Sequence, residues 1–193
     1  MSESDVLLRP ARDADGPAVS ALIEPIFAEY EGVLFIPEEM PELETLATTF
    51  ARAGGAFFCA ERDGRVVGCV GWVPSRDDHL ELKKLYVAKS ERRSGLGSRL
   101  AGLVEEEARR RGLAVELWSD AKFVTAHRFY ERRGYRRDGR TRELHDASDT
   151  LEYYFRRDLD CATEEGATEE EGATEEGATE EPANPGAPAA GGG

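Results

Sequence analysis

Cysteine and histidine are scarce in this chain of 193 residues, which has three of each. The cysteines are Cys59, Cys69 and Cys161; their number is odd, they form no CxxC pair, and the histidines stand far apart. We therefore expect neither a disulfide framework nor a zinc or other metal site. Unpaired, reduced thiols are typical of a cytoplasmic protein, so a cytoplasmic location is expected.

Long apolar runs are also missing. The stretch from Val66 to Val73 falls far short of the ~20 apolar residues that a membrane-spanning helix needs. The first ten residues show no basic region followed by an apolar run, so we expect no signal peptide. Two common phosphate-binding motifs, GxxxxGKS/T and GxGxxG, are absent as well. The sequence therefore predicts no membrane partner and neither of these nucleotide sites.

Positive charge is in the minority, with 25 basic against 39 acidic residues and a net charge of −14. This balance argues against a nucleic-acid binder held by phosphate attraction. The charge is unevenly distributed. Residues 1–82 carry 16 acidic and 6 basic side chains, residues 83–160 carry 14 and 19, and residues 161–193 carry 9 and none. A site for an anionic ligand is therefore expected within residues 83–160.

Residues 161–193 differ from the rest of the chain. They repeat units such as ATEEG, end in PANPGAPAAGGG, and contain no large apolar residue after Cys161. A repeat without an apolar face cannot bury a core, so a disordered acidic tail is expected. The preceding residues, 1–160, are numerous enough for one domain with its own core.

The apolar pattern of residues 5–157 predicts alternating strands and helices. A first helix is expected to begin after Asp13 and to extend to Phe27, with Pro25 kinking or interrupting it. Further helices are expected over 41–52, 96–111 and 125–133. Strands are expected over 5–9, 56–61, 65–73, 79–88, 114–118, from 135 onward, and over 151–157, with Asp63 and Gly64 in a tight hairpin turn. This order predicts an α/β fold in which a mixed sheet carries helices on both faces.

The strand expected over residues 79–88 carries a break in its alternation. Leu80 and Leu82 alternate, but Lys84 occupies the next apolar position and the pattern resumes one residue late at Leu85. Such a slip predicts a β-bulge near Lys84 and the lysine before it. Bulges often lie beside active sites. An exposed lysine pair at a sheet edge would give the same pattern, and this alternative stays open.

A basic turn that contains two glycines follows this strand. Between Lys83 and Arg99 there are six basic residues and one acidic residue. Gly95 and Gly97 let the backbone approach a phosphate group closely, and a helix that begins here directs free N–H groups and the positive end of its dipole at an anion. Residues 92–98 are therefore the predicted phosphate-binding turn, with a plain tight connection as the alternative.

Two blocks of this sequence resemble the GNAT superfamily of N-acetyltransferases. The acetyl-CoA signature of that family, Q/R-x-x-G-x-G/A, is matched by RRSGLG at residues 92–97. Its alanine-aromatic-tyrosine helix, which ends in glycine and an aromatic residue, is matched by AHRFYERRGY at residues 126–135. The resemblance covers residues 5–158. It implies an acyl-CoA acyltransferase fold with a mixed, mostly antiparallel sheet, and direct transfer of acetyl from acetyl-CoA to a primary amine, without a metal or a covalent acetyl-enzyme.

The resemblance also assigns roles to residues. Leu85, Tyr86 and Val87 would offer backbone groups to the pantetheine arm and the acetyl carbonyl, and the basic turn would hold the pyrophosphate. The residues of that turn are Arg92, Arg93, Ser94, Gly95, Leu96, Gly97 and Ser98. Phe123 stands where many family members have an asparagine that helps to hold CoA, so this contact is not carried over.

For catalysis, the resemblance makes Tyr130 the general acid. A phenol with a pKa of ~10 can protonate a departing thiolate whose conjugate acid has a pKa of ~8.5. The base stays open: Glu81 matches a position from which some family members use a glutamate, directly or through water. His79 is a second candidate, and the absence of a dedicated base is a third possibility. His127 is expected on the surface of its helix without a catalytic role.

The acceptor amine is not identified by these residues. A small amine, an amino acid and a protein amine all fit, in a monomer or a homodimer. Acidic residues of the first half could favour a cationic acceptor, or could simply form solvated faces. These residues are Glu24, Glu29, Glu31, Glu38 and Glu39.

Two other functions stay open beside catalysis. One is an acetyl-CoA-binding sensor or scaffold without turnover. The other is an RNA-contacting module, for which the arginine-rich residues 120–142, with interleaved tyrosines, would provide the surface.

Overall fold

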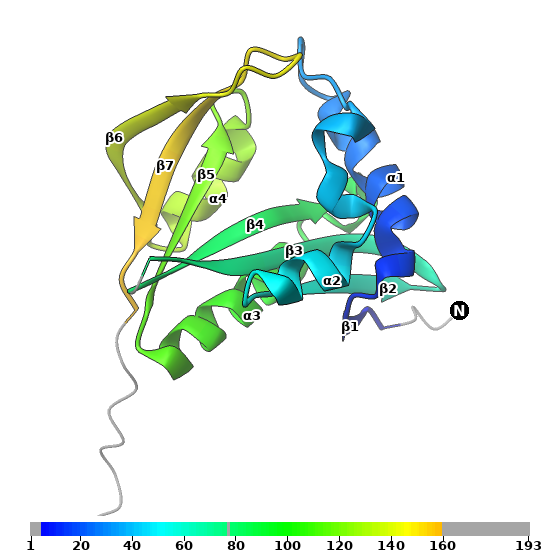
Figure 1. Cartoon of the computed structure of the whole chain (residues 1–193), viewed down its shortest axis with the longest axis horizontal. Coiled ribbons are helices and arrows are strands. Elements are labelled where there is room, and N and C mark those ends of the chain that lie inside the picture. The colour runs from blue at the N-terminus through cyan, green and yellow to red at the C-terminus, as the bar shows by residue number, and fades with distance from the viewer. Residues whose placement is uncertain (1–4, 77, 160–193) are drawn as a thin grey trace, which may run out of the picture. The chain divides into compact units, whose positions relative to one another are not determined.

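One seven-stranded sheet organises the described part of the chain, which comprises residues 5–76 and 78–159 in a computed structural model (Figure 1). The strands lie in the order β1-β2-β3-β4-β5-β7-β6, and all neighbouring pairs are antiparallel except β4 with β5. The predicted mixed, mostly antiparallel sheet is confirmed. Its strands are β1 (Leu7–Pro10), β2 (Ala56–Arg62), β3 (Arg65–Arg76), β4 (His79–Val87), β5 (Ala114–Asp120), β6 (Arg136–Glu143) and β7 (Leu151–Arg157).

Helices pack on both faces of the sheet, as predicted. They are α1 (Gly16–Phe27), α2 (Leu46–Arg52), α3 (Leu96–Arg111) and α4 (Val124–Arg132). On one face, Leu100 and Val104 of α3 and Tyr130 of α4 share a buried core with Leu82 of β4. On the other face, α1 and α2 share a second core with β2, built around residues such as Ile23, Phe50 and Phe57.

The hairpin between β2 and β3 has the predicted turn. Asp63 and Gly64 both adopt positive φ angles, of 50° and 74°. Two consecutive residues of this kind form the tight turn whose twist matches the flanking antiparallel strands. The Asp-Gly pair therefore fixes the register of the hairpin.

Two helix predictions are corrected by the structure. Pro25 does not interrupt α1, which continues past it to Phe27, although proline has no N–H and so removes one intrahelical hydrogen bond. The helix expected over 41–52 is divided into a 3-10 turn, Pro41–Leu43, and α2, which begins at Leu46. The Leu43 carbonyl, in the 3-10 turn, lies so close to Gly16 of α1 that any side chain at position 16 would collide with it.

The predicted tail, residues 161–193, and residue 160 of the predicted domain lie outside the described residues. Among the helices of the described residues, none has the length and apolar character required to cross a membrane.

Candidate functional site

β4 and β5 diverge in the middle of the sheet. They pair only where His79–Glu81 meets Ala114–Glu116, and β5 then continues beside β7 (Figure 1). Beyond Glu81, the edge of β4 that faces β5 has no strand partner within the described residues. Its backbone N–H and C=O groups are therefore free to bind something other than a strand.

The predicted β-bulge lies just past this point. Opposite β4, Gly71 pairs with Lys83 and Cys69 pairs with Tyr86, so β4 contains one residue more than β3 over this interval. Lys84 has a φ of 55°, and its carbonyl accepts a hydrogen bond from the Cys69 thiol at 3.2 Å. The bulge predicted from the break in alternation is confirmed, and it bends β4 where β4 leaves β5.

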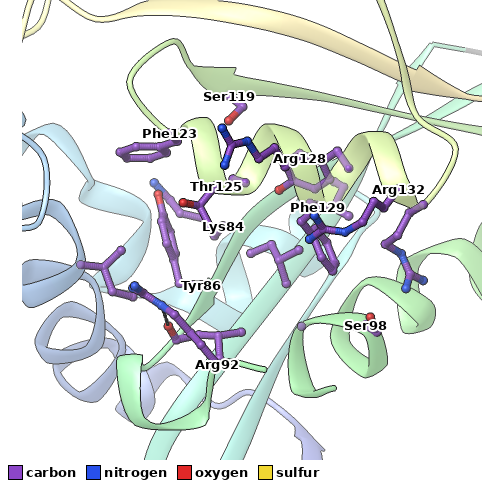
Figure 2. A pocket seen from close by; sticks show the side chains of 18 of the residues that line it. Lys84, Tyr86, Arg92, Ser98, Ser119, Phe123, Thr125, Arg128, Phe129 and Arg132 are labelled. Atoms are coloured by element: carbon purple, nitrogen blue, oxygen red, sulfur yellow. Dashed lines mark hydrogen bonds between the residues drawn. The ribbon is translucent and has the colours of Figure 1, made fainter. Parts of the chain in front are cut away.

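A cavity of about 990 Å³ occupies this opening (Figure 2). It is lined by β4, the turn before α3, the end of β5, and α4. Among the residues predicted to hold a cofactor, those that line it are Leu85, Tyr86, Val87, Arg92, Arg93, Gly95, Gly97 and Ser98. Two predicted residues do not line it. Leu96 is 2% exposed and belongs to the core, and the Ser94 hydroxyl donates a hydrogen bond to the Glu91 carbonyl.

The turn before α3 has the geometry of an anion site. Gly95 occupies the N-cap position with a φ of 86°, in the left-handed region that favours glycine. The first N–H groups of a helix have no partner within the helix, and Gly97 and Ser98 of this first turn line the cavity. A negatively charged group in the cavity would therefore meet free N–H donors and the positive end of the α3 dipole.

Arg92 is engaged within the protein. Its two terminal nitrogens lie 2.6 and 2.8 Å from the carboxylate oxygens of Glu29, and its Nε donates to the Val87 carbonyl at 3.3 Å. The hydrogen bonds from Arg92 lower the pKa of Glu29. Glu29, which was expected to favour a cationic acceptor, is thus neutralised by the predicted phosphate-binding turn.

Tyr130 lies on α4 and lines the cavity from the α3 face of the sheet. Its side chain is 6% exposed, with its ring 5.6 Å from the ring of Tyr135 and 5.8 Å from that of Phe155. Burial raises the pKa of Tyr130 well above the ordinary phenol value. The phenol therefore keeps its proton throughout the neutral range.

Glu81, the first candidate base, lies at the last pair of β4 with β5, where its strand partner is Glu116. Its carboxylate forms an ion pair with Lys83 at 2.9 Å. Leu80 and Leu82 point into the α3 core, so strand alternation places Glu81 on the opposite, α1 and α2, face. Glu81 does not line the cavity.

The two histidines of this region are both buried. His79, the second candidate base, is 2% exposed, with Nδ1 2.5 Å from an Asp78 carboxylate oxygen, and it does not line the cavity. The expectation for His127 is wrong: it is buried rather than on the helix surface. Its Nε2 lies 2.9 Å from the Asp120 carbonyl oxygen, which joins α4 to the end of β5, and burial lowers its pKa.

Several side chains that line the cavity were not among the predicted site residues. Phe123 packs against Phe27 and Tyr30 at ring distances of 5.7 and 4.6 Å, so it fills space where the family has a polar residue. For the arginines of α4, the sequence offered one signal of a place at the cavity, which was their helical spacing on a basic helix. The missed residues are Ile26, Tyr30, Leu82, Lys84, Trp118, Ser119, Phe123, Thr125, Ala126, Arg128, Phe129, Arg132 and Arg133.

The far rim of the opening is closed by loops. The segment between β6 and β7 reaches the segment between α1 and α2 (Figure 1). The Leu34 N–H donates to the Ser148 hydroxyl oxygen and the Ala147 N–H donates to a Glu39 carboxylate oxygen, both at 2.9 Å. These bonds connect the two sides of the sheet beyond the point where the strands separate.

Comparison with known proteins connects this arrangement to one family. The model of the acetyltransferase (GNAT) family matches residues 21–135. A Mycobacterium tuberculosis protein named as an N-acetyltransferase is 28% identical over 151 residues, which are 73% of this chain and 86% of that protein. An Escherichia coli protein, also named as an N-acetyltransferase, is 33% identical over 106 residues, which are 51% of this chain and 62% of that one.

Solved structures share the fold. A GNAT-family acetyltransferase from Staphylococcus aureus superposes with a TM-score of 0.68 at 22% identity, over 79% of this chain and 99% of that one. A Salmonella typhimurium acetyltransferase structure, described as containing its cofactor acetyl-CoA, gives a TM-score of 0.61 at 17% identity, over 85% and 99% of the two chains.

Proposed function

Because this chain belongs to the acetyltransferase (GNAT) family, we propose that it transfers acetyl from acetyl-CoA directly to a primary amine. One observation carries the proposal: the free edge of β4, the N-terminus of α3 and the Tyr130 phenol all line one cavity. The amine can belong to a small molecule, an amino acid or a protein.

The cavity has the groups that acetyl-CoA requires. The first turn of α3 offers N–H donors to the pyrophosphate, and Arg93 adds positive charge beside it. Beyond its last pair with β5, the edge of β4 from Leu82 to Val87 offers backbone groups to the amides of the extended pantetheine arm, as an edge strand does to an added strand; the Val87 carbonyl already accepts a hydrogen bond from Arg92. These contacts would place the thioester near the divergence of β4 and β5.

Acetyl transfer forms a bond between the amine nitrogen and the acetyl carbon and breaks the bond from that carbon to sulfur. Tyr130 donates its phenolic proton to the departing sulfur. Burial raises the pKa of Tyr130, so the phenol is protonated at neutral pH and gives up its proton only as negative charge develops on the sulfur. The amine loses one proton to a base and the departing sulfur gains one from Tyr130, so the step balances with one base and one acid.

The candidate acid and the candidate base come from different faces of the sheet. Tyr130 lies on the α3 face, and alternation places Glu81 on the α1 and α2 face, beside the point where the strands diverge. We assign Glu81 as the base, acting through water, with the amine entering from its face. His79 is the weaker candidate because it is buried and hydrogen-bonded to Asp78.

A cytoplasmic location is part of this proposal. It is supported by Cys59 and Cys69, which are free thiols although each is the strand partner of the other.

Thiol release from acetyl-CoA across a panel of amines tests the activity, with mass spectrometry of the product. We expect turnover with at least one amine, and we expect Tyr130→Phe to lower kcat by about 10²- to 10⁴-fold with little change in KM for acetyl-CoA. The matched control is Tyr153→Phe, because Tyr153 lies on β7 outside the cavity.

Two results of this experiment would count against the proposal. Binding of acetyl-CoA without turnover on any amine would support a sensor or scaffold. Equal kcat values for the wild type and Tyr130→Phe would remove Tyr130 from the mechanism.

A further inference from the structure

The cavity contains more positive charge than the proposed pyrophosphate contact uses. Its lysine and arginine side chains are Lys84, Arg92, Arg93, Arg128, Arg132 and Arg133. Three are neutralised within the protein: Lys84 by Glu42 at 2.8 Å, Arg92 by Glu29 at 2.6 Å, and Arg133 by Glu105 at 2.6 Å. The other three, Arg93, Arg128 and Arg132, form no ion pair or side-chain hydrogen bond with the described residues.

These three arginines fall into two separate groups. Arg93 belongs to the turn before α3 and serves the pyrophosphate. Arg128 and Arg132 lie four residues apart on α4, so they share one face of that helix with Cβ atoms roughly 5–6 Å apart. Figure 2 shows both on α4, across the cavity from Arg92 and Ser98. A second anionic group is therefore expected on the α4 side.

Acetyl-CoA carries such a group. Apart from its pyrophosphate, it has a phosphate monoester on the 3′ position of the ribose, with close to two negative charges at neutral pH. The guanidinium group of each arginine presents planar, paired N–H donors that suit the oxygens of a phosphate. Building on the proposed function, we propose that Arg128 and Arg132 bind this 3′-phosphate, so the protein distinguishes CoA from 3′-dephospho-CoA.

The position of the pair favours a small ligand over RNA. Both arginines line the same cavity as the helix N-terminus and Tyr130. An RNA backbone would instead need a surface along which successive phosphates could lie.

Calorimetric titration with CoA and with 3′-dephospho-CoA tests this site without any acceptor. We expect the wild type to bind CoA about 10- to 100-fold more tightly than the dephospho form. The double variant Arg128→Ala/Arg132→Ala should lose this preference, through weaker binding of CoA and unchanged binding of dephospho-CoA. Arg136→Ala is the matched control, because Arg136 is an exposed arginine of β6 outside the cavity.

Several outcomes would overturn the inference. Equal binding of the two ligands by the wild type would show that no 3′-phosphate site exists. Equal weakening of both ligands in the double variant would show a general charge effect. A retained CoA preference with loss of single-stranded RNA binding would assign the pair to RNA. Because Arg128 and Arg132 are exposed, the variants should fold normally, which circular dichroism checks.

Failure of this proposal is distinguishable from failure of the proposed function. A protein that discriminates the 3′-phosphate without acetylating any amine supports the site and contradicts the reaction. A protein that acetylates amines equally well from acetyl-CoA and its dephospho form supports the reaction and contradicts the site.

Discussion

Glycine occupies positions 95 and 97, at the start of α3, for two different reasons. At Gly95 the backbone has a φ of 86°, yet no atom lies within 4 Å of the place where a Cβ would stand. At Gly97 a Cβ would meet Phe129 and Val87 at 3.7 Å, an ordinary contact distance. Conformation therefore requires glycine at position 95, and the protein itself leaves room for a methyl group at position 97.

Substituting these two glycines should separate strain from space. We expect Gly95→Ala to lower the free energy of unfolding by about 1–2 kcal/mol, because left-handed backbone is unfavourable for alanine, and to weaken acetyl-CoA binding. Gly97→Ala should fold at least as stably, since alanine favours helices by roughly 0.5–1 kcal/mol. Urea unfolding and CoA titration measure both effects. A larger loss of stability at position 97 would contradict this assignment.

The role of a single residue can be predicted from the sequence when the local backbone decides that role, and not when tertiary packing decides it. The bulge at Lys84 was predictable because a slipped alternation is a local property of the strand. The pairing of Arg92 with Glu29 was not, because it joins residues 63 positions apart. His127 was misjudged for the same reason, since β7 covers the helix face that would otherwise meet water.

At the scale of elements, α3, α4 and β7 meet at one buried carboxylate. Glu105 of α3 is 2% exposed. It accepts hydrogen bonds from Arg133 at 2.6 and 3.0 Å and from the Tyr135 hydroxyl at 3.2 Å, and Arg157 lies 3.0 Å away. Because α3 follows the proposed phosphate-binding turn and α4 carries Tyr130, this cluster holds the two walls of the cavity together.

Removing this charge should destabilise the fold. We expect Glu105→Gln to lower the free energy of unfolding by about 3 kcal/mol, at the lower end for breaking a buried ion pair, because Arg133 and Arg157 keep some contact with water. Glu107→Gln is the control on the same helix. It breaks pairs with Arg110 and Arg111 at the surface and should cost less than about 1 kcal/mol. Urea unfolding of both variants at pH 7 decides; equal losses would contradict a special role for Glu105.

The elements themselves were largely predictable from the sequence. Periodicity identified the strands and the long helix α3, and the Asp63 and Gly64 turn identified the hairpin. The division of the helix expected over 41–52 into a 3-10 turn and α2 was missed, because the apolar pattern continues across the break. The divergence of β4 and β5 could not be predicted from the residues either, since the choice of strand partners leaves no local pattern in the sequence.

At the scale of the whole molecule, two thiols lie inside the sheet core. Cys59 and Cys69 are strand partners on β2 and β3 and have no exposed surface. Burial raises the pKa of Cys59 to about 11 and raises the pKa of Cys69 further. In the unfolded chain both thiols ionise near their ordinary pKa of ~8.5. Above that pH the unfolded state therefore holds fewer protons than the folded state.

The stability of the protein should consequently fall in mild alkali. Between about pH 8.5 and 10 we expect the free energy of unfolding to decrease by about 1.4 kcal/mol per pH unit for each thiol, and to be independent of these thiols below pH 8. Urea unfolding under reducing conditions measures the slope. Cys59→Ala should be less stable at every pH but should show a shallower decline. A stability that stays constant to pH 9.5 would contradict the burial of the thiols in solution.

The three-pair junction of β4 with β5 divides the described sheet into two leaves. One leaf comprises β1 to β4 and the other comprises β5, β7 and β6, and each comes from a nearly continuous part of the chain. Beyond this junction, the two leaves are also connected at the rim by the hydrogen bonds of Leu34 with Ser148 and of Ala147 with Glu39. A ligand in the opening touches both leaves and braces them against each other. Binding of such a ligand therefore stabilises the folded sheet, at the place where β4 and β5 form no hydrogen bonds with each other.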